Sequence, residues 1–388
     1  MILKSSITRP LLCAALILAL AWGCAGPGLR LTGQKGVLEP NRIIELKTGQ
    51  DLTPGELTAG LALAGIVFIG EMHRHPLQHR HQLEIIKGLW ERNRNLVLGL
   101  EVFARPRQDL LDRWVAGKMK EHEFKEKLQD GILNRSTLEV YFALLDWARE
   151  KQVPILALNA PRAVAAQVAR SGLAGLTEKQ RRNTAKDIRL GPEAYKQRVG
   201  RAFHGHATAG GLDNFFAAQV VWDETMAETL TDYLSSEAGQ GRRAVVICGN
   251  EHIFYGYGVP NRVARRWSGS QARLLMLVSS DDETLTPKAA DFVWVTRPAP
   301  PVKRLRLGVG LKTSTSGELI VDLVVPGSEA GRIGLEPGDK LLKMDGRPLN
   351  SFMDLHRAAV ADGPDREHDL TVDREGRVLK FKFHFREE

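Results

Sequence analysis

Cysteine is scarce in this chain, whose 388 residues include only three. A secreted fold held together by disulfides is therefore excluded, because such folds use many paired cysteines. Beyond residue 24 only Cys248 remains, and its apolar surroundings in the sequence predict a buried structural thiol. The chain also lacks CxxC, P-loop, GxSxG and HExxH patterns, so thiol-zinc, nucleotide-loop and serine-hydrolase sites have no support.

A concentrated basic region is also missing. The chain has 54 Lys and Arg against 46 Asp and Glu, a net charge of +8 that is spread along its length. The densest run, at residues 179–182, is flanked by Glu178 and Asp187. A nucleic-acid partner is not expected, because nucleic-acid binders gather their charge on one element or tail. With 43% hydrophobic residues, the composition is that of a globular protein with a sizeable core.

The chain has no apolar run long enough to span a bilayer in its N-terminal region, where residues 11–22 are apolar. This run ends in Ala-Trp-Gly-Cys at Cys24 and resembles the lipobox of bacterial lipoproteins. The resemblance implies that Cys24 receives a diacylglycerol and becomes the new N-terminus. Cleavage by an ordinary signal peptidase is the alternative. Because no Asp follows Cys24, we expect a lipid-anchored protein of the bacterial cell envelope, at the outer membrane and facing the periplasm.

Short apolar runs alternate with helix-like spacings through the middle of the chain. Continuous apolar runs separated by helices are typical of an α/β fold with a mainly parallel sheet covered by helices. The helical segments are longer than simple crossovers need, which predicts helical insertions. The predicted strands are at residues 65–69, 95–100, 154–158, 243–248 and 273–278.

The composition changes along the chain and predicts five segments. A Pro-rich stretch marks a stiff linker, and the strands after it are short and separated by turns. The segments are a lipoprotein signal peptide (1–24), a tether (25–53), the α/β domain (54–296), the linker (297–302) and a small β-rich domain (303–388).

The last segment resembles a bacterial PDZ domain. The resemblance is carried by the run from Leu307 to Leu311 and by the Gly-containing turns at residues 325–330, 334–339 and 344–346. It implies a groove that captures a protein or peptide C-terminus by strand addition, with backbone N–H groups holding the carboxylate. A PDZ domain that only packs within its own chain is the alternative. The implied peptide-binding residues are Leu307, Gly308, Val309 and Gly310.

Carboxylate and imidazole side chains follow the predicted strands. Glu71 and His73 come after the first strand, Glu101 after the second and His252 after the fourth. Because the carboxyl ends of parallel strands share one edge of a sheet, we expect these side chains to converge. Together they could ligate Zn, Mn or Fe, or they could present imidazoles to a haem.

The segment at residues 249–260 concentrates aromatic side chains. A tyrosine phenolate can ligate ferric haem iron, so Tyr255 and Tyr257 are candidate haem ligands, and packing on a neighbour is the alternative. Haem propionates need cations, for which Arg74, Arg162 and Arg262 are candidates. His79 and His81, by contrast, are expected on the exposed face of a helix that begins at Pro76.

Five pieces of the chain, in order, resemble the ChaN family of haem-binding bacterial lipoproteins. The resemblance implies an α/β domain that binds haem in iron acquisition, and a homodimer whose two chains share the haem is one arrangement that it implies. The wider superfamily includes erythromycin esterase-like hydrolases and Tiki-type metalloproteases. The pieces are residues 69–73, 100–103, 158–162, 219–227 and 249–260.

The superfamily implies a second hypothesis, a metal-dependent peptidase or esterase. In it Glu71 or Glu101 is the general base, and His73 and His252 are metal ligands or stabilise the transition state. A third hypothesis is an interaction protein whose PDZ domain is the working part. We rank haem binding first, the hydrolase second and the interaction protein third.

Overall fold

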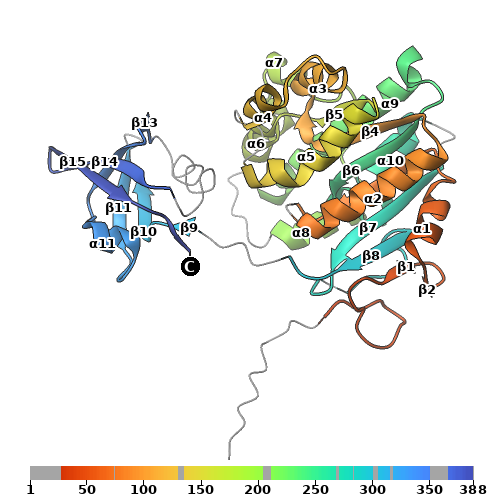
Figure 1. Ribbon diagram of the computed structural model, residues 1–388, viewed down its shortest axis with the longest axis horizontal. Helices are drawn as coiled ribbons and strands as arrows, with labels where there is room; N and C mark the ends of the chain where they lie inside the picture. The colour runs from red at the N-terminus through yellow and green to blue at the C-terminus, as the bar shows by residue number, and fades with distance from the viewer. Residues whose placement is uncertain are drawn as a thin grey trace, which may run out of the picture.

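The computed structural model describes most of the chain beyond its N-terminal region (Figure 1). The predicted signal peptide, its Cys24 and Arg74 lie outside the described residues. No helix within the described part is long and apolar enough to cross a membrane. The described ranges are 28–73, 75–129, 135–203, 211–267, 271–282, 284–299, 305–314, 318–349 and 366–387.

An eight-stranded sheet in the order β2-β1-β8-β7-β3-β6-β4-β5 forms the centre of the larger domain. The six strands from β8 to β5 are parallel, and β1 and β2 join one edge in antiparallel fashion. The predicted α/β fold class is confirmed. The strands are β1 (Ile43–Glu45), β2 (Gln50–Asp51), β3 (Ile66–Glu71), β4 (Leu96–Ala104), β5 (Ile155–Asn159), β6 (Arg243–Gly249), β7 (Ala272–Ser279) and β8 (Phe292–Thr296).

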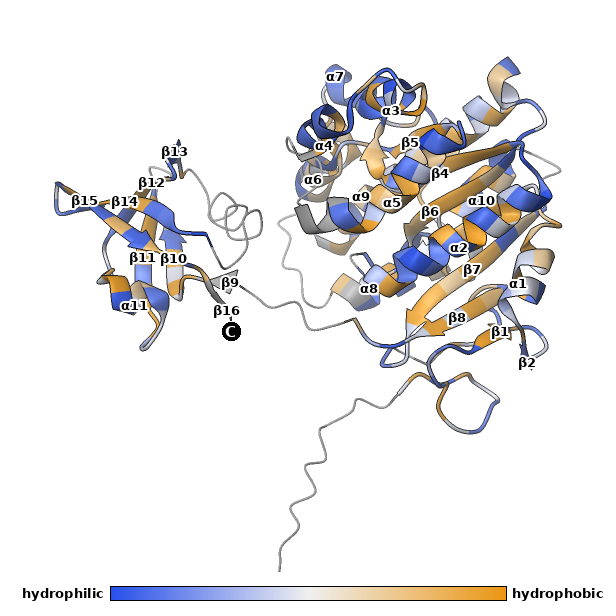
Figure 2. Cartoon of the chain, viewed as in Figure 1, coloured by the Kyte–Doolittle hydropathy of each residue, from blue (hydrophilic) through white to orange (hydrophobic). Residues whose placement is uncertain are grey.

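Helices cover both faces of this sheet because its strands are apolar on both sides. Val67 and Ile69 of β3 share a buried cluster with residues of α2 and α5, whereas Ile66 and Phe68 share another with residues of α9 and α10. Figure 2 shows the central strands as largely hydrophobic and the helices as two-sided. The helices are α1 (Pro54–Leu61), α2 (Pro76–Arg92), α3 (Gln108–Val115), α4 (Glu121–Gln129), α5 (Arg135–Glu150), α6 (Arg162–Ser171), α7 (Glu178–Arg181), α8 (Glu193–Phe203), α9 (Gly211–Ser235) and α10 (Val259–Arg266).

The segment expected to be a tether is part of the folded domain from residue 28 onward. Leu29, Leu31 and Leu38 are at most 2% exposed. β1 then pairs with β8, a strand that the sequence analysis did not predict. The correction has a simple physical reason: apolar residues spaced between turn-forming ones bury against the sheet edge without needing a regular strand or helix pattern.

The smaller domain contains an antiparallel sheet in the order β10-β11-β12-β14-β15, in which β13 also pairs with β12. β9 and β16 pair in a separate two-stranded sheet. Its core includes Leu319, Val321 and Phe383. The elements are β9 (Leu305–Arg306), β10 (Val309–Thr313), β11 (Leu319–Val324), α11 (Glu329–Ile333), β12 (Lys340–Met344), β13 (Arg347–Pro348), β14 (His368–Arg374), β15 (Arg377–Phe383) and β16 (Arg386–Glu387).

Candidate functional site

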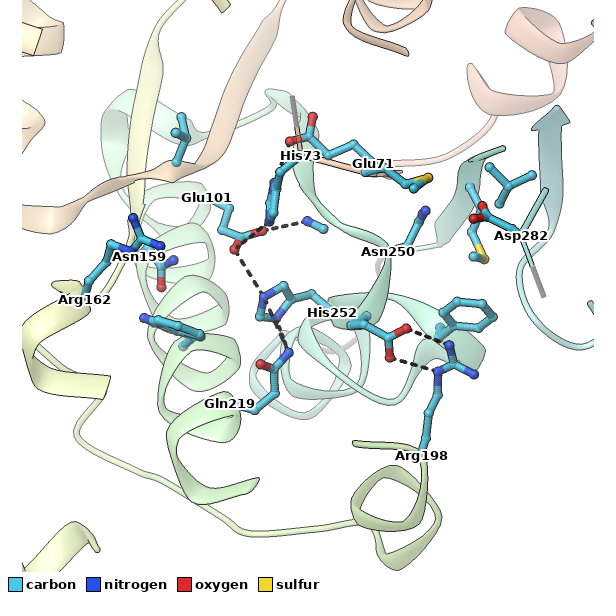
Figure 3. Close-up of a pocket in the computed structure, with 18 of the residues that line it drawn as sticks. Glu71, His73, Glu101, Asn159, Arg162, Arg198, Gln219, Asn250, His252 and Asp282 are labelled. Carbon is cyan, nitrogen blue, oxygen red and sulfur yellow. Dashed lines mark hydrogen bonds and ion pairs between the residues drawn. The ribbon is translucent and has the colours of Figure 1, made fainter. Parts of the chain in front are cut away.

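A cavity of about 870 Å³ opens at the carboxyl ends of the parallel strands (Figure 3). β3 ends at Glu71, β5 ends at Asn159, and β6 leads through a short turn into His252. The cavity therefore brings together the strand-end residues that the sequence analysis singled out. They are Glu71, His73, Glu101, Arg162 and His252.

His73 presents one ring nitrogen to this cavity. Its Nδ1 lies 2.9 Å from Oε1 of Glu71, and its Nε2 lies 3.9 Å from Oε1 of Glu101. The side chain is 59% exposed, whereas that of Glu71 is fully buried. The hydrogen bond with Glu71 is the main cause that raises the pKa of His73, against the opposing effect of burial.

His252 is held more tightly, between two carboxylates. Its Nδ1 lies 2.6 Å from Oδ1 of Asp223, and its Nε2 lies 3.2 Å from Oε1 of Glu101. Burial alone would lower the pKa of His252, but the charges of Glu101 and Asp223 outweigh burial and raise it well above its usual value. The two carboxylates therefore favour the protonated form of this imidazole.

Glu101 is the carboxylate that the two imidazoles share. Burial opposes its ionisation, yet the neighbouring His252, His73 and the backbone N–H of Gly249 lower the pKa of Glu101 to about 2. The Gly249 N–H donates to Oε2 at 2.6 Å. A Cβ at Gly249 would lie 3.1 Å from Nε2 of His73, so the absence of a side chain there leaves room for the imidazole.

Two buried polar side chains support Glu71: Tyr141, which also lines the cavity, and Gln82, which does not. Oε2 accepts a hydrogen bond from Nε2 of Gln82 at 2.7 Å, and Oε1 accepts one from the Tyr141 hydroxyl. Burial would raise the pKa of Glu71, but the hydrogen bond from His73, the charges of His79 and His73 and the hydrogen bond from Gln82 lower it. Glu71 is therefore an ionised carboxylate surrounded by donors.

The helix that carries Gln82 corrects two expectations. It begins at Pro76, but His79 is only 6% exposed and packs against Tyr141 at a ring-centroid distance of 4.4 Å. The side chain of His81 is 12% exposed and its ring stacks on Trp294 at 4.0 Å. The prediction of an exposed helix face is wrong for both, because this face of α2 packs on α5 and on β8.

Among the described residues, two arginine side chains line the cavity, and only one of them is available to pair with a ligand. Arg162, the first residue of α6, is exposed and lines the cavity. Arg198 instead forms a two-point ion pair with Glu251, at 3.0 and 2.6 Å, and its guanidinium lies 3.4 Å from the ring centroid of Phe254.

Arg262 does not serve the predicted propionate role. It is 1% exposed, and its guanidinium donates to the backbone carbonyl oxygens of Tyr257, Gly258 and Gly191. A buried guanidinium that is engaged by three carbonyl groups has no surface for a carboxylate ligand.

The two candidate tyrosine ligands lie outside the residues that line the cavity. Their rings stack at 5.3 Å, and the Tyr255 oxygen accepts a hydrogen bond from the Thr286 hydroxyl at 3.3 Å. Tyr255 has a φ of +56°, in the left-handed region that non-glycine residues rarely adopt. Of the aromatic residues in this segment, only Phe254 lines the cavity.

The sequence analysis did not single out Asp223, Gln82 or Tyr141 as site residues. Asp223 follows Gln219 by four positions on α9, so both face the same side of the helix. Asp223 is followed directly by Glu224 on α9, so its carboxylate alone was no distinctive signal. Gln82 and Tyr141 carry no distinctive signal either, because an amide and a phenol are ordinary on amphipathic helices.

The geometry around the four Glu and His side chains bears on the metal hypothesis. Among the described residues, no group of three or more His, Cys, Asp or Glu side chains is arranged to hold a metal ion. The nearest nitrogen and oxygen atoms instead pair with one another as imidazoles with carboxylates. The metal alternative therefore gains no support from this site.

Comparison with known proteins places the domain in a family. A family model described as "Haem-binding uptake, Tiki superfamily, ChaN" matches residues 57–263, more than half of the chain. The chain thus carries an α/β domain of the haem-binding class and belongs to the ChaN family. A PDZ family model matches residues 306–384, which identifies the smaller domain as a PDZ domain.

A solved structure shares the fold. The structure described as "Cofacial heme binding to ChaN of Campylobacter jejuni" aligns with a TM-score of 0.53 and 17% identity, over 68% of this chain and 98% of that one. At this identity the similarity establishes the fold alone. The helices and strands that form the cavity therefore belong to an architecture already known in a ChaN protein.

Curated relatives match only in part. Protein RETICULATA-RELATED 5, chloroplastic, of Arabidopsis thaliana is 25% identical over 269 residues, which are 61% of this chain and 35% of the relative. The periplasmic pH-dependent serine endoprotease DegQ of Escherichia coli strain K12 is 22% identical over 44% of this chain and 34% of its own length. The chain thus spans about a third of the length of these relatives.

Proposed function

We propose that the ChaN domain of this chain binds haem in the strand-end cavity, with the His73 imidazole as the iron ligand. The observation that carries the proposal is the orientation of the His73 ring and the hydrogen bond that it makes. Its Nδ1 is tied to the buried Glu71 carboxylate, and its Nε2 is directed into the cavity. A carboxylate at one ring nitrogen fixes the tautomer and orients the other nitrogen toward a metal. His252 is unsuited, because both of its ring nitrogens already face carboxylates, Nδ1 that of Asp223 and Nε2 that of Glu101.

The rest of the cavity fits a porphyrin. A volume of about 870 Å³ lies within the range of small-molecule sites. Arg162 at the rim supplies a cation for a propionate. When bound, the haem iron would supply a redox-active centre, and the residues of this chain bind and orient the group. The apolar side chains of the cavity include Met72, Val102, Trp222, Phe254, Met276, Val278 and Leu285.

We extend this proposal to a lipid-anchored protein that acquires haem or iron at the outer membrane, facing the periplasm. The leader sequence ending at Cys24 supports the anchor. The Leu29 N–H donates to the Ser280 carbonyl at 2.8 Å, and Leu31 pairs with Leu285, which lines the cavity. The four Cα–Cα steps from Cys24 to Gly28 span at most about 14 Å. A lipid on Cys24 would therefore hold the cavity rim near the membrane.

We also propose that the PDZ domain binds a peptide C-terminus at β10, by strand addition. On one side β10 pairs with β11, and it pairs with no other strand among the described residues. Gly308 has a φ of +82°, and a Cβ there would lie 2.1 Å from Cβ of Ser328. Only glycine therefore allows the turn that leads into β10.

The haem proposal predicts a saturable shift of the Soret band when hemin is added to the chain beginning at Ala25, which retains every described residue. His73→Ala is expected to lower the affinity by more than the roughly 10–100-fold that loss of a ligand's outer partner costs. Absorbance titration measures both. Sizing of the same samples reports whether hemin loading produces a homodimer, as the cofacial arrangement described for the Campylobacter jejuni protein leads us to propose.

Tyr255→Phe is the matched control, since it removes one oxygen from a residue outside the cavity. This variant is expected to bind hemin as the unchanged protein does. The opposite pattern, with binding lost in Tyr255→Phe and kept in His73→Ala, would move the haem to the aromatic segment and contradict the cavity proposal.

The PDZ proposal predicts that a fluorescent peptide with an apolar C-terminal residue binds the same chain at least about tenfold more tightly as a free carboxylate than as an amide, because the amide has lost its charge-assisted hydrogen bonds. Fluorescence anisotropy measures the two affinities. Gly308→Val is expected to abolish the preference while hemin binding is retained. Equal binding of the acid and the amide would disprove carboxylate capture.

A further inference from the structure

The Glu71 carboxylate is saturated with hydrogen-bond donors from three elements. On Oε1 it receives Nδ1 of His73 at 2.9 Å and the Tyr141 hydroxyl, and on Oε2 it receives Nε2 of Gln82 at 2.7 Å. Nδ1 of His79 lies 3.5 Å from Oε2. The Glu71 side chain itself is fully buried. Because an ionised carboxylate only accepts hydrogen bonds, every neighbour must present a hydrogen to it.

Gln82 has its amide orientation fixed by a second contact. Its Oε1 lies 3.0 Å from Nδ1 of His79, so the oxygen faces His79 and the NH₂ group faces Glu71. An amide with the reverse orientation would place two acceptors against each other at Glu71. Gln82 is 1% exposed and does not line the cavity, so it acts only through the carboxylate.

His73 depends on this arrangement for its tautomer. Facing an acceptor, its Nδ1 must carry the hydrogen, which leaves Nε2 as the nitrogen with a free lone pair. The ring is 59% exposed, so packing does little to hold it. The contact with Glu71 is its only hydrogen bond to a side chain within the part of the chain that the structure describes.

Like His73, His252 has its Nδ1 bound to a buried carboxylate, but its Nε2 is not available to a ligand. A fully buried carboxylate, Asp223, binds its Nδ1, but Nε2 is occupied by Glu101 at 3.2 Å and the ring is 5% exposed. Of the two imidazoles anchored in this way, only His73 offers its second nitrogen to a ligand.

We infer that Tyr141 and Gln82 are positioning residues, which hold the Glu71 carboxylate as an acceptor and thereby keep Nε2 of His73 available for ligand binding. The inference deepens the haem proposal and rests on it for the identity of the ligand. Without either donor, a buried carboxylate oxygen loses its partner and the carboxylate is free to turn away from Nδ1. The imidazole would then populate both tautomers, and the Nε2–H tautomer cannot ligate iron.

The test uses the chain from Ala25 with ¹⁵N-labelled histidine, without hemin. In the unchanged protein, measured in alkaline solution where the His73 ring is neutral, the His73 signals, assigned by their loss in His73→Asn, are expected to show a hydrogen on Nδ1 only. Tyr141→Phe and Gln82→Met are each expected to shift these signals toward a mixture of tautomers and to weaken hemin binding about 10–100-fold.

Tyr195→Phe is the matched control, since Tyr195 is an equally buried phenol whose hydroxyl lies near Glu251 rather than Glu71. It should leave the His73 tautomer unchanged, because its hydroxyl contacts Gln219 and the Glu251 carbonyl group and none of the donors on Glu71. The inference is overturned if Tyr141→Phe, Gln82→Met and their folded double variant all keep a pure Nδ1–H tautomer. If the unchanged protein binds no hemin, the haem proposal fails, but the tautomer measurement still decides the positioning role.

Discussion

Replacing Asp223 with alanine is expected to lower the free energy of unfolding by about 3–5 kcal/mol, because removing one partner of a buried ion pair leaves the other charge uncompensated. Asp223 is fully buried on α9, and its Oδ1 lies 2.6 Å from Nδ1 of His252. Without it, the His252 imidazolium keeps only Glu101 as a charged partner. Urea unfolding followed by circular dichroism measures the change.

Asp213→Ala is the matched control on the same helix. The Asp213 side chain is 81% exposed and pairs with Lys196 at the surface, where ion pairs contribute little. This variant is expected to unfold at nearly the same urea concentration as the unchanged protein. If the two variants were equally stable, the buried pair of Asp223 and His252 would have no special role in stability.

The loss in the free energy of unfolding caused by Asp223→Ala is also expected to depend on pH, and the pKa of His252 decides the direction of that dependence. The folded state raises the pKa of His252 well above its usual value, so the stability gained from its charge is complete below pH 6.5, the usual value, and is lost as pH rises through the raised pKa. The loss of stability in Asp223→Ala should therefore be largest in mildly acidic solution, just below pH 6.5, and shrink as the pH rises into the alkaline range. A loss that grew with rising pH would contradict this assignment of charge.

Replacing Gly258 with alanine is expected to cost about 3 kcal/mol or more and to disorganise the cavity. A Cβ at this position would lie 2.2 Å from the carbonyl oxygen of His252 and 2.7 Å from its carbonyl carbon. Both contacts are with backbone, so no side chain can rotate to make room, and the effect lies at the upper end of overpacking costs. The turn that carries His252 must move, and hemin affinity should fall together with stability.

Gly55→Ala is the control for this prediction. It lies in the first turn of α1, and the nearest atom to an added Cβ is the Thr53 hydroxyl oxygen at 3.9 Å. Alanine favours helix, so this variant is expected to be as stable as the unchanged protein or slightly more stable. Thermal unfolding of the two variants side by side measures the contrast. A Gly258→Ala protein that melted with the control would mean that the turn at residues 249–260 can rearrange at little cost.

Much of the fold followed from local pattern. Continuous apolar runs bounded by helical spacings identified five of the parallel strands, because a strand buried on both faces must be apolar at successive positions. The N-terminal segment was misassigned as a tether. Leu29, Leu31 and Leu38 bury their side chains through irregular backbone pairing with distant residues such as Ser280 and Leu285, and such pairing leaves no period in the sequence.

The residues of the candidate site also fall into two groups, those predicted from their position in the sequence and those placed by tertiary packing. Strand-end position was enough to predict that Glu71, His73, Glu101 and His252 would meet, since parallel strands share one edge. Arg262 was also predicted as a cation for a haem propionate, but the fold buries it against backbone carbonyl groups. Sequence position sets the edge of the sheet at which a side chain starts, but the packing of helices decides whether its end reaches the cavity.

The amino-acid sequence by itself determined the α/β class, the PDZ domain, the ChaN relationship and the group of imidazoles and carboxylates, because each depends on local periodicity or on short motifs. The tertiary structure alone decided what each imidazole can do. His252 is closed between Asp223 and Glu101, whereas Nε2 of His73 remains open, with Glu71 held behind it by Gln82 and a buried tyrosine. Hydrogen-bond partners from distant helices set charge and tautomer, and no local pattern encodes which partners the folded chain brings together.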